Sequence, residues 1–387
     1  MHNNVFELIK LSFWGKGDPT VDLSVYQEMK SQAIAALPAP VLSSLGLPPE
    51  LLREWRNAVY QQIASYEHYI HFQSQLPINV PYVILKGSSA AQYYPHPEYR
   101  AMGDIDIITR QEDYGSSCET MLKNAWRETT NGSDVKRGRH RSFEKKGIVV
   151  EIHAFFASMN DVQKAKAFDE LVRRSITEEH VLPDLVNGLV LIEHVNQHLE
   201  EGIGLRQIID WMMFVDKCLT DDKWNEFEAM AAETGLKELA VTTTRMCEMY
   251  LGLPSHKWCM AANERMCSDL MEYIMKCGDF GIKKDQKDTL YVSGLYQLRH
   301  PIATIKGLQR KGYENPVIRS NPILKPFAWI VEAKRRLCKT PHHLEKYRKA
   351  RKTNALFKSL GICRSTDGLV YYKDGQYYKQ KKGIRIT

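Results

Sequence analysis

The stretch from Tyr82 to Arg110 reads YVILKGSSAAQYYPHPEYRAMGDIDIITR. Its first four residues form an apolar run of strand length, which stops at Lys86-Gly87-Ser88-Ser89. A helix of small residues starts there, a proline-broken loop follows, and a second strand-like run begins at Asp104. The order of strand, glycine-serine turn, short helix and acidic strand predicts an α/β unit around this stretch.

The second strand-like run carries two carboxylates on one face. Side chains alternate along a strand, so Asp104 and Asp106 point to one side while Ile105 and Ile107 point to the other. Two carboxylates about 7 Å apart repel each other unless a positive group lies between them. Mg²⁺ is a hard cation that proteins bind through one or two carboxylates plus substrate phosphates. The pair therefore predicts a site for a divalent cation.

The turn before this run has the features of an anion site. Gly87 lets the backbone come close to a ligand, and Ser88 and Ser89 offer hydroxyl and N–H groups where a helix begins. We therefore expect a phosphate-binding turn followed by a metal-binding strand. Each motif alone is also ordinary, since Asp-x-Asp is common and Gly-Ser often forms a turn after a strand.

Gly87-Ser88 followed by Asp104-Ile105-Asp106 resembles the signature of the polymerase-beta-like nucleotidyltransferase superfamily. The longer string Leu85-Lys86-Gly87, Tyr94-Pro95 and Arg100 to Asp106 resembles a bacterial family described as uncharacterised nucleotidyltransferases. The spacer from Ser88 to Asp104 is somewhat longer than in the minimal superfamily pattern. The resemblance implies an α+β fold, in which a small mixed sheet of the polymerase-beta type is embedded in a mostly α-helical chain.

A third carboxylate on a neighbouring strand completes the metal site in this superfamily. The best candidate is Glu151, in the apolar run from Ile148 to Phe155, where it shares a strand face with Val149 and His153. The resemblance implies that Glu151 joins the two aspartates at the metal and serves as the base for the attacking hydroxyl. It also assigns the triphosphate to the turn, through Lys86, Gly87 and Ser88.

Basic residues elsewhere are candidates for further phosphate contacts. We expect Arg100 and His140 to contact phosphate, because basic side chains pair with phosphate oxygens and the planar fork of arginine binds two at once. His140 belongs to a basic loop, Lys136 to Arg141, which could equally be a solvated hairpin. Within the resemblance, Arg206 and Asp210 close the cleft over the nucleotide. The alternative is an ion pair four residues apart within one helix.

His194 and His198 also lie four residues apart on an expected helix. That spacing can bind zinc, but Val195 stands where a zinc peptidase helix has glutamate. We therefore do not expect zinc there.

The reaction implied by the resemblance is transfer of a nucleoside monophosphate from an NTP to a hydroxyl acceptor, with release of pyrophosphate. We expect ATP as the nucleotide and two Mg²⁺ ions, or Mn²⁺ in their place. A small molecule, a protein hydroxyl and an RNA 3′ end are all suitable acceptors. Two alternatives stay open: a catalytically silent binding module with the same fold, and an RNA-directed nucleotidyltransferase that uses the C-terminal tail.

The chain has 387 residues and a mass of 44.6 kDa, with 43% hydrophobic and 26% charged residues, which is typical of a globular protein. This length predicts two or three structural units. We expect an N-terminal helical region at 1–77 and a catalytic α/β core at 78–157. A helical domain at 158–340 would form the other wall of the cleft, and a basic tail would span 341–387.

The basic charge of the chain lies in its C-terminal part. The formal net charge is +7, yet residues 331–387 alone contain 16 basic and 4 acidic residues. Tyrosines and lysines alternate around Asp374-Gly375, a turn pattern that predicts a hairpin. Such a surface could bind nucleic acid by stacking and phosphate contact. Basic tails are more often simply solvated, so we do not favour nucleic acid as a partner.

Neither a signal peptide nor a membrane partner is expected. No apolar run approaches membrane-spanning length, and the N-terminus lacks the basic-then-apolar plan of a signal peptide. The eight cysteines are scattered without a Cys-x-x-Cys pair. We therefore expect a cytoplasmic protein with reduced thiols.

Overall fold

The computed structural model describes residues 2–132, 138–283, 301–313, 318, 320–321, 324–337, 340–362, 370–373 and 376–379. The chain divides into two compact units. The first consists of Met1–Lys283 and Ser359–Thr387, and the second of Lys284–Lys358. The second unit contains α14 (Pro301–Gly312), η5 (Lys325–Phe327), α16 (Ala328–Leu337) and all but the last residue of α17 (Thr340–Ser359).

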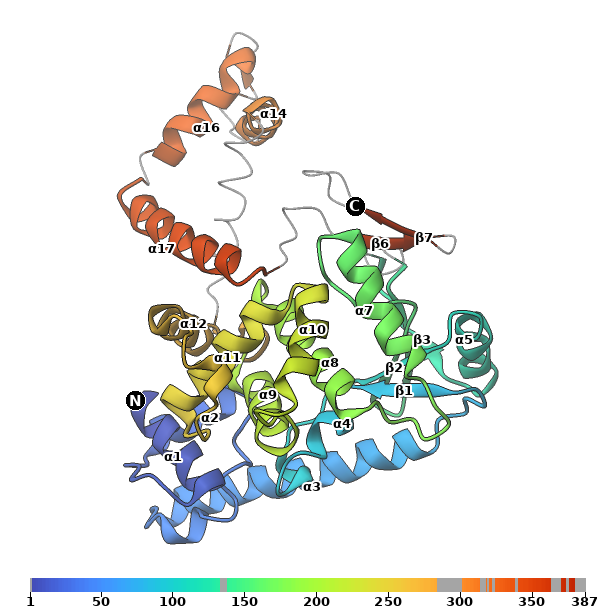
Figure 1. Ribbon diagram of the computed structural model, residues 1–387. Coiled ribbons are helices and arrows are strands. Elements are labelled where there is room, and N and C mark those ends of the chain that lie inside the picture. Colours follow the sequence, from blue (N-terminus) through green and yellow to red (C-terminus); the bar gives the residue numbers. More distant parts are fainter. Residues whose placement is uncertain are drawn as a thin grey trace. The chain divides into compact units, whose positions relative to one another are not determined.

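The first unit contains a mixed five-stranded sheet, drawn toward the right-hand side of Figure 1. Its spatial order is β1-β2-β5-β4-β3, and only the central pair, β2 and β5, is parallel. The strands are β1 (Tyr82–Leu85), β2 (Ile105–Thr109), β3 (Arg127–Glu128), β4 (His140–Lys145) and β5 (Ile148–His153). Together with the surrounding helices, this sheet confirms the α+β class predicted from the sequence.

The register of the central strands places the acidic residues side by side. Asp106 of β2 lies opposite Glu151 of β5, and two residues further on Ile108 lies opposite His153. On the other side of β5, Ser142 pairs with Glu151. One face of the sheet therefore carries a polar row across three strands.

The other face of the sheet is apolar and forms a core with two helices. Ile105 and Ile107 of β2 belong to this core, together with Val150 and Ile152 of β5. The core also contains side chains of α3 (Pro49–Ser74) and α5 (Tyr114–Lys123). The alternation predicted for the acidic strand is thus confirmed, because the isoleucines of β2 face this core.

Helix α3 begins with Pro49 in its first turn, where a proline costs no hydrogen bond. Its C-terminal half lies beside β1 (Figure 1). Helix α5 is short and spans only Tyr114–Lys123. The chain leaves the helix at Ala125, which has a φ of 60°. Between β1 and β2 lie α4 (Ser88–Ala91) and η2 (Pro97–Tyr99).

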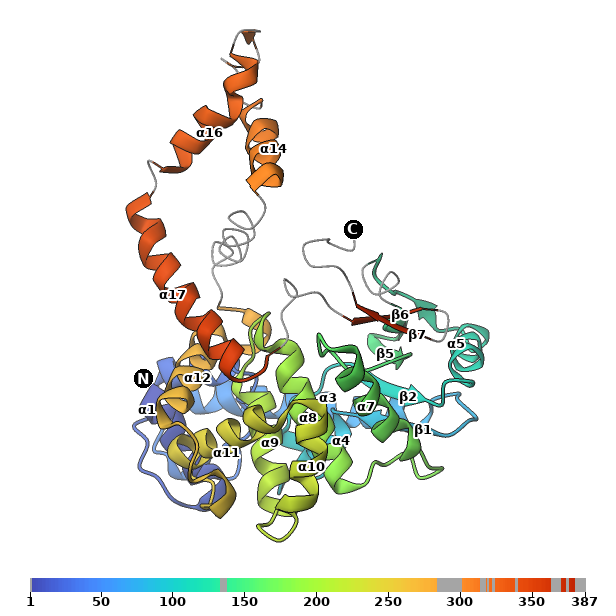
Figure 2. The ribbon, with the colours of Figure 1, turned by 45° about the horizontal axis from the view of Figure 1, so that its top comes forward.

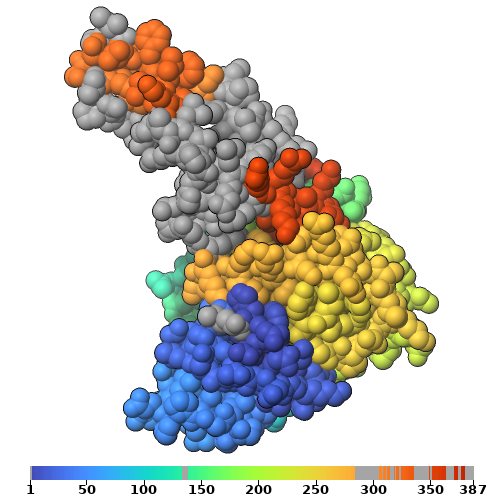
Figure 3. Space-filling model, turned by 90° about the vertical axis from the view of Figure 1, so that its left-hand side faces the viewer, coloured from blue at the N-terminus to red at the C-terminus, as the bar shows by residue number. Residues whose placement is uncertain are grey.

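Helices make up the rest of the first unit. Before α3 come α1 (His2–Trp14), α2 (Leu23–Ser31) and η1 (Leu42–Ser44). After the sheet come α7 (Val162–Arg174), α8 (Asp184–Leu199), α9 (Leu205–Cys218), α10 (Trp224–Thr234), α11 (Lys237–Leu251), η3 (Lys257–Cys259), α12 (Glu264–Cys277) and η4 (Asp279–Gly281). The N-terminal helix packs against α11, where Trp14 donates to the carbonyl of Leu251 at 2.8 Å (Figure 3).

The predicted C-terminal hairpin is confirmed by the antiparallel strands β6 (Val370–Lys373) and β7 (Gln376–Lys379). Its turn, Asp374-Gly375, lies outside the described residues. The hairpin lies beside α7 (Figure 2), where the Tyr377 hydroxyl donates to Asp169, and the ring of Tyr372 lies 6.2 Å from that of Phe155. Two tyrosines of the tail therefore pack on the protein itself.

No described helix combines the length and apolar character needed to cross a membrane.

Candidate functional site

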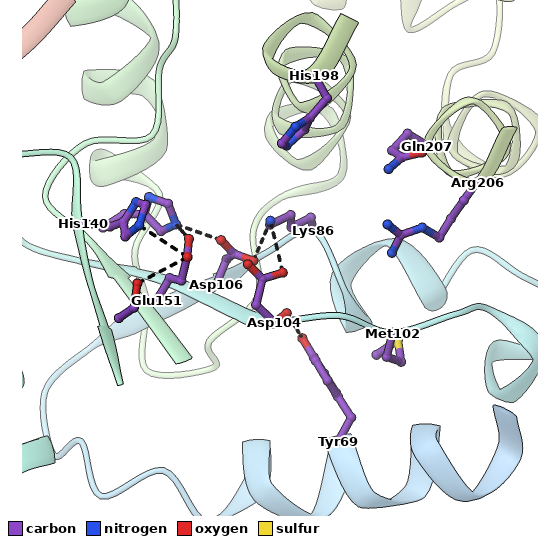
Figure 4. A network of polar contacts seen from close by, with 12 residues as sticks. Tyr69, Lys86, Met102, Asp104, Asp106, His140, Glu151, His198, Arg206 and Gln207 are labelled. Carbon is purple, nitrogen blue, oxygen red and sulfur yellow. Dashed lines mark hydrogen bonds and ion pairs between the residues drawn. The ribbon is translucent and has the colours of Figure 1, made fainter. Parts of the chain in front are cut away.

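Three carboxylates converge on the polar face of the sheet (Figure 4). Asp104 immediately precedes β2, Asp106 lies in β2, and Glu151 lies opposite Asp106 in β5. One oxygen of each lies within 4.8 Å of the others. The parallel pairing of β2 with β5 thus brings together residues that are 45 positions apart in the chain.

Lys86 supplies a positive charge to this acidic cluster. Its Nζ lies 2.8 Å from Asp106 Oδ2 and 3.4 Å from Asp104 Oδ1. The residue follows β1 directly and has a φ of 43°, which begins the turn. The ammonium contacts the same carboxylates that a metal ion would use. A single lysine charge cannot balance three carboxylates.

Two histidines border the cluster on the β4–β5 side. His153 Nε2 lies 2.8 Å from Asp106 Oδ1, and His140 Nε2 lies 3.3 Å from Glu151 Oε1. The two histidines are direct partners in the β4–β5 register, so both rings reach the same face. His140, expected to contact phosphate, thus contacts Glu151. The role of His153 was missed, although its shared face with Glu151 could have suggested it.

Burial and mutual repulsion hold protons on this cluster. Burial and the charge of Asp104 raise the pKa of Asp106 to about 7. Burial and the charge of Asp106 raise the pKa of Glu151 to about 8. Burial also opposes ionisation of Asp104. The charge of Lys86 and a backbone hydrogen bond outweigh burial and lower the pKa of Asp104 to about 2. Burial lowers the pKa of His153, so its ring is neutral.

The donor set fits a hard divalent cation. Three carboxylates within reach of one another offer several oxygens, and oxygen is the ligand that Mg²⁺ and Mn²⁺ prefer. Burial and the neighbouring carboxylates raise the pKa values of Asp106 and Glu151, and a bound cation would favour their ionised forms. Asp104, Asp106 and Glu151 could therefore hold a metal ion.

The glycine-serine turn is fastened to α3. Gly87 has a φ of 54° and a ψ of −117°, a conformation that favours glycine. The Tyr69 hydroxyl closes over it and donates to the carbonyl of Asp104 at 3.3 Å. Ser88 Oγ donates to Gln73 Oε1 at 2.6 Å. The turn thus lies next to the carboxylates, while the Ser88 hydroxyl is engaged by α3.

Gly87→Ala is expected to lower the free energy of unfolding by about 2–5 kcal/mol. A Cβ there would lie 2.3 Å from Tyr69 Oη, and the positive φ adds strain. In a Tyr69→Phe background the closest neighbour would be the ring carbon, at 3.3 Å, so the same substitution should cost less. Urea denaturation of the wild type, the two single variants and the double variant measures this coupling. Equal costs in both backgrounds would contradict the packing described here.

Arg100 lies away from the carboxylate cluster, in a buried ion pair. Its Nε and Nη2 donate to Asp210 at 2.8 and 2.6 Å, and Tyr94 Oη donates to the same carboxylate at 2.7 Å. Its Nη1 donates to the carbonyl of Ala101 at 2.9 Å. The pair fastens the loop before Asp104 to α9. Asp210 is therefore the partner of Arg100 and does not form the ion pair with Arg206 that the sequence left open.

Arg206 extends from the start of α9 toward the loop before β2. Its Nη1 donates to the carbonyl of Ala101 at 3.3 Å, and its Nη2 lies 3.2 Å from Asp279 Oδ2. Figure 4 shows Arg206, Gln207 and His198 pointing from α9 and α8 toward Lys86. These helices thus form a second wall that faces the carboxylates.

The remaining candidates are the basic loop from Lys136 to Arg141 and the histidine pair His194 and His198. In the loop Lys136 to Arg141, residues 136 and 137 lie outside the described residues. Arg139 donates to the carbonyl of Phe156 at 3.2 Å. His194 and His198 have ring centroids 4.8 Å apart, but neither joins a cluster of three possible metal ligands in the part of the chain that the structure describes. The zinc alternative therefore gains no support.

A family model described as uncharacterised nucleotidyltransferase matches residues 23–252, more than half of the chain. No curated protein and no solved structure matches the chain. The matched range contains the three carboxylates, Lys86 and Arg206, and it ends before Asp279.

Proposed function

The chain belongs to the uncharacterised nucleotidyltransferase family, and from this premise we propose that it transfers a nucleoside monophosphate from an NTP to a hydroxyl acceptor, with release of pyrophosphate. The observation that carries the proposal is the convergence of Asp104, Asp106 and Glu151 beside the turn at Gly87. Carboxylates for a cation next to a close backbone approach suit the phosphates of a nucleotide.

Each acidic residue has a role in this proposal. Asp104 and Asp106 hold Mg²⁺, and Glu151 completes the site or accepts the proton of the acceptor hydroxyl. Bound Mg²⁺, expected as two ions with Mn²⁺ as a substitute, supplies charge neutralisation for the triphosphate and activation of the attacking oxygen. His153 and Lys86 position the carboxylate of Asp106, which lies between them.

The set of residues proposed to contact the nucleotide is smaller than the set that the sequence alone suggests. Once a cation neutralises the carboxylates, the Lys86 ammonium can move from the aspartates to phosphate oxygens. Gly87 and the backbone of Ser88 lie beside the same position, and Arg206 approaches from the opposite wall. Arg100 and His140 are engaged by Asp210 and Glu151, so we propose that they position those groups and do not touch phosphate.

The reaction is tested with NTPs labelled at either the α- or the γ-phosphate. The full-length protein is incubated with each, Mg²⁺ and a cell extract, and labelled products are separated by size and class. Nucleotidyl transfer places the α-label in the acceptor and the γ-label in pyrophosphate. Transfer of the γ-label to an acceptor would instead indicate a kinase and would overturn the proposal.

Stability of the metal-free protein is expected to fall as pH rises from about 5 to about 8. Asp106 and Glu151 have pKa values raised to about 7 and 8, so between pH 5 and 8 the folded state binds more protons than the unfolded state. The stabilisation is complete at pH values below the pKa values of these groups in the unfolded state. It is lost as pH rises through their pKa values in the folded state. Asp104, with its lowered pKa, acts only at more acidic pH. Urea denaturation across this range measures the slope.

Glu151→Gln is the control for this pH dependence. Glutamine cannot titrate, so the slope above pH 5 should become shallower. Mg²⁺ or Mn²⁺ should restore stability near pH 8, because a bound cation favours the ionised carboxylates. An unchanged slope in Glu151→Gln would show that the buried carboxylates are not responsible.

ATP as the nucleotide, a cytoplasmic location, a bacterial source and the four-part division of the chain stay predictions. The packing of Tyr372 and Tyr377 against the protein leaves fewer rings for stacking on RNA, so we do not propose the RNA-directed alternative. The three retained carboxylates favour an enzyme over a silent binding module.

A further inference from the structure

A short strap, Gly278 to Ile282 with η4 at its centre, crosses the start of α9. Asp279 accepts from Gln207 Nε2 at 2.9 Å and from Arg206 Nη2 at 3.2 Å. The backbone of the strap also lies directly on the loop between α8 and α9. A Cβ at Gly204 would lie 2.8 Å from the Cα of Asp279, so the loop leaves no room for a larger residue. The strap is therefore held in a defined position.

Phe280 is an exposed aromatic residue of this strap. Its φ is 47°, and 52% of its surface is exposed. Its ring centroid lies 5.1 Å from the ring of His198 and 5.3 Å from the Arg206 guanidinium. An exposed aromatic ring and a left-handed phenylalanine are both unfavourable for folding alone. A ring held in this way, beside a cation and an imidazole, has the form of a stacking platform.

Unpaired polar atoms lie on the same wall. Among the described residues, His194 Nε2, Arg206 Nε and Gln207 Oε1 are buried and have no hydrogen-bond partner. Buried polar groups normally have partners, and His194 as a whole is only 2% exposed. Figure 4 shows the side chains of Gln207 and Arg206 directed toward Lys86. These atoms indicate that the wall is built to contact a polar ligand.

Arg206 connects the platform to the carboxylate cluster. On one side its Nη1 reaches the carbonyl of Ala101, three residues before Asp104, and on the other its guanidinium lies against Phe280. A ligand whose anionic groups lie at Lys86 and the carboxylates can therefore pass Arg206 and place a planar group against the Phe280 ring.

We propose that Phe280, with His198 and Arg206 around it, forms the subsite for the base of the nucleotide. The inference rests on the proposed function, because it assigns the planar part of the same NTP. Every base has a π-face, so a phenylalanine platform binds bases without requiring a particular one. The strap lies outside the range matched by the family model, which ends at residue 252.

The test compares two ligands that both carry a chain of phosphates, of which only one carries a base. Full-length wild type, Phe280→Ala and Phe280→Trp are titrated calorimetrically with α,β-methylene ATP and, separately, with inorganic triphosphate, both with Mg²⁺. Ile282→Ala is the matched control, since Ile282 is in the same strap and is 73% exposed. Phe280→Ala should weaken nucleotide binding by roughly 5- to 150-fold. Binding of triphosphate should not change, and Phe280→Trp should retain nucleotide binding.

Each other outcome has a distinct meaning. An equal loss for both ligands in Phe280→Ala, or the same loss in Ile282→Ala, would show a general effect on the strap and would overturn the base subsite. Unchanged nucleotide binding in Phe280→Ala would overturn it as well and would leave the proposed function intact. If the wild type bound neither ligand, the proposed function itself would fail, and the subsite with it.

Discussion

Asp106→Asn is expected to reduce nucleotidyl transfer about a thousandfold, since a metal-binding carboxylate contributes several kcal/mol to charge stabilisation. Asp106 is fully buried and lies at the centre of the network, between Lys86 and His153. Asparagine has nearly the same shape, so the loss would come from the missing charge. Transfer of the α-label at saturating Mg²⁺ measures it.

The control for this substitution is Asp113→Asn. Asp113 precedes α5, makes no side-chain capping hydrogen bond there and is not one of the three clustered carboxylates, so the change removes one carboxylate from outside the cluster. Its activity should match that of the wild type. Full activity of Asp106→Asn, with the fold intact by circular dichroism, would mean that the carboxylate cluster does not bind the catalytic metal.

Asp210→Asn is expected to destabilise the protein by about 3–5 kcal/mol, because it leaves a buried guanidinium without its charge partner. The side chains of Arg100 and Asp210 are 2% and 1% exposed, and two arginine nitrogens contact the carboxylate. The Tyr94 hydroxyl donates to the same carboxylate, so its hydrogen bond would lose the charge of its acceptor. Chemical denaturation of the metal-free protein measures the change.

Two further variants separate the charge effect from a general loss of packing. Replacing both partners, as in Arg100→Met with Asp210→Leu, should cost less than Asp210→Asn, because no buried charge remains unpaired. Glu264→Gln removes an exposed partner of Arg245 and should cost no more than about 1 kcal/mol. An equal cost for Asp210→Asn and Glu264→Gln would contradict the structural role of the buried pair.

The sequence predicted the parts of the site that depend on local pattern. Alternation along a strand placed Asp106 and Ile107 on opposite faces, and the same rule placed Glu151 on a single face of its own strand. The break after Leu85 marked the turn at Gly87. These features depend on neighbours within a few residues, which a single sequence displays.

The contacts that the sequence did not predict involve distant partners. Arg100 and Asp210 are 110 positions apart, and nothing local distinguishes an arginine that binds phosphate from one held by a buried carboxylate. His140 was expected at phosphate, but the β4–β5 register places it beside Glu151. The contacts of Lys86 with both aspartates, and of Phe280 with Arg206, likewise depend on tertiary packing.

The most direct test of the account is a crystal structure of the full chain with Mn²⁺ and α,β-methylene ATP, in which anomalous scattering locates the metal. The account predicts manganese bound to Asp104, Asp106 and Glu151 and to phosphate oxygens, with Lys86 moved from the aspartates toward the phosphates. Manganese elsewhere, with Lys86 still paired to Asp104 and Asp106, would contradict it.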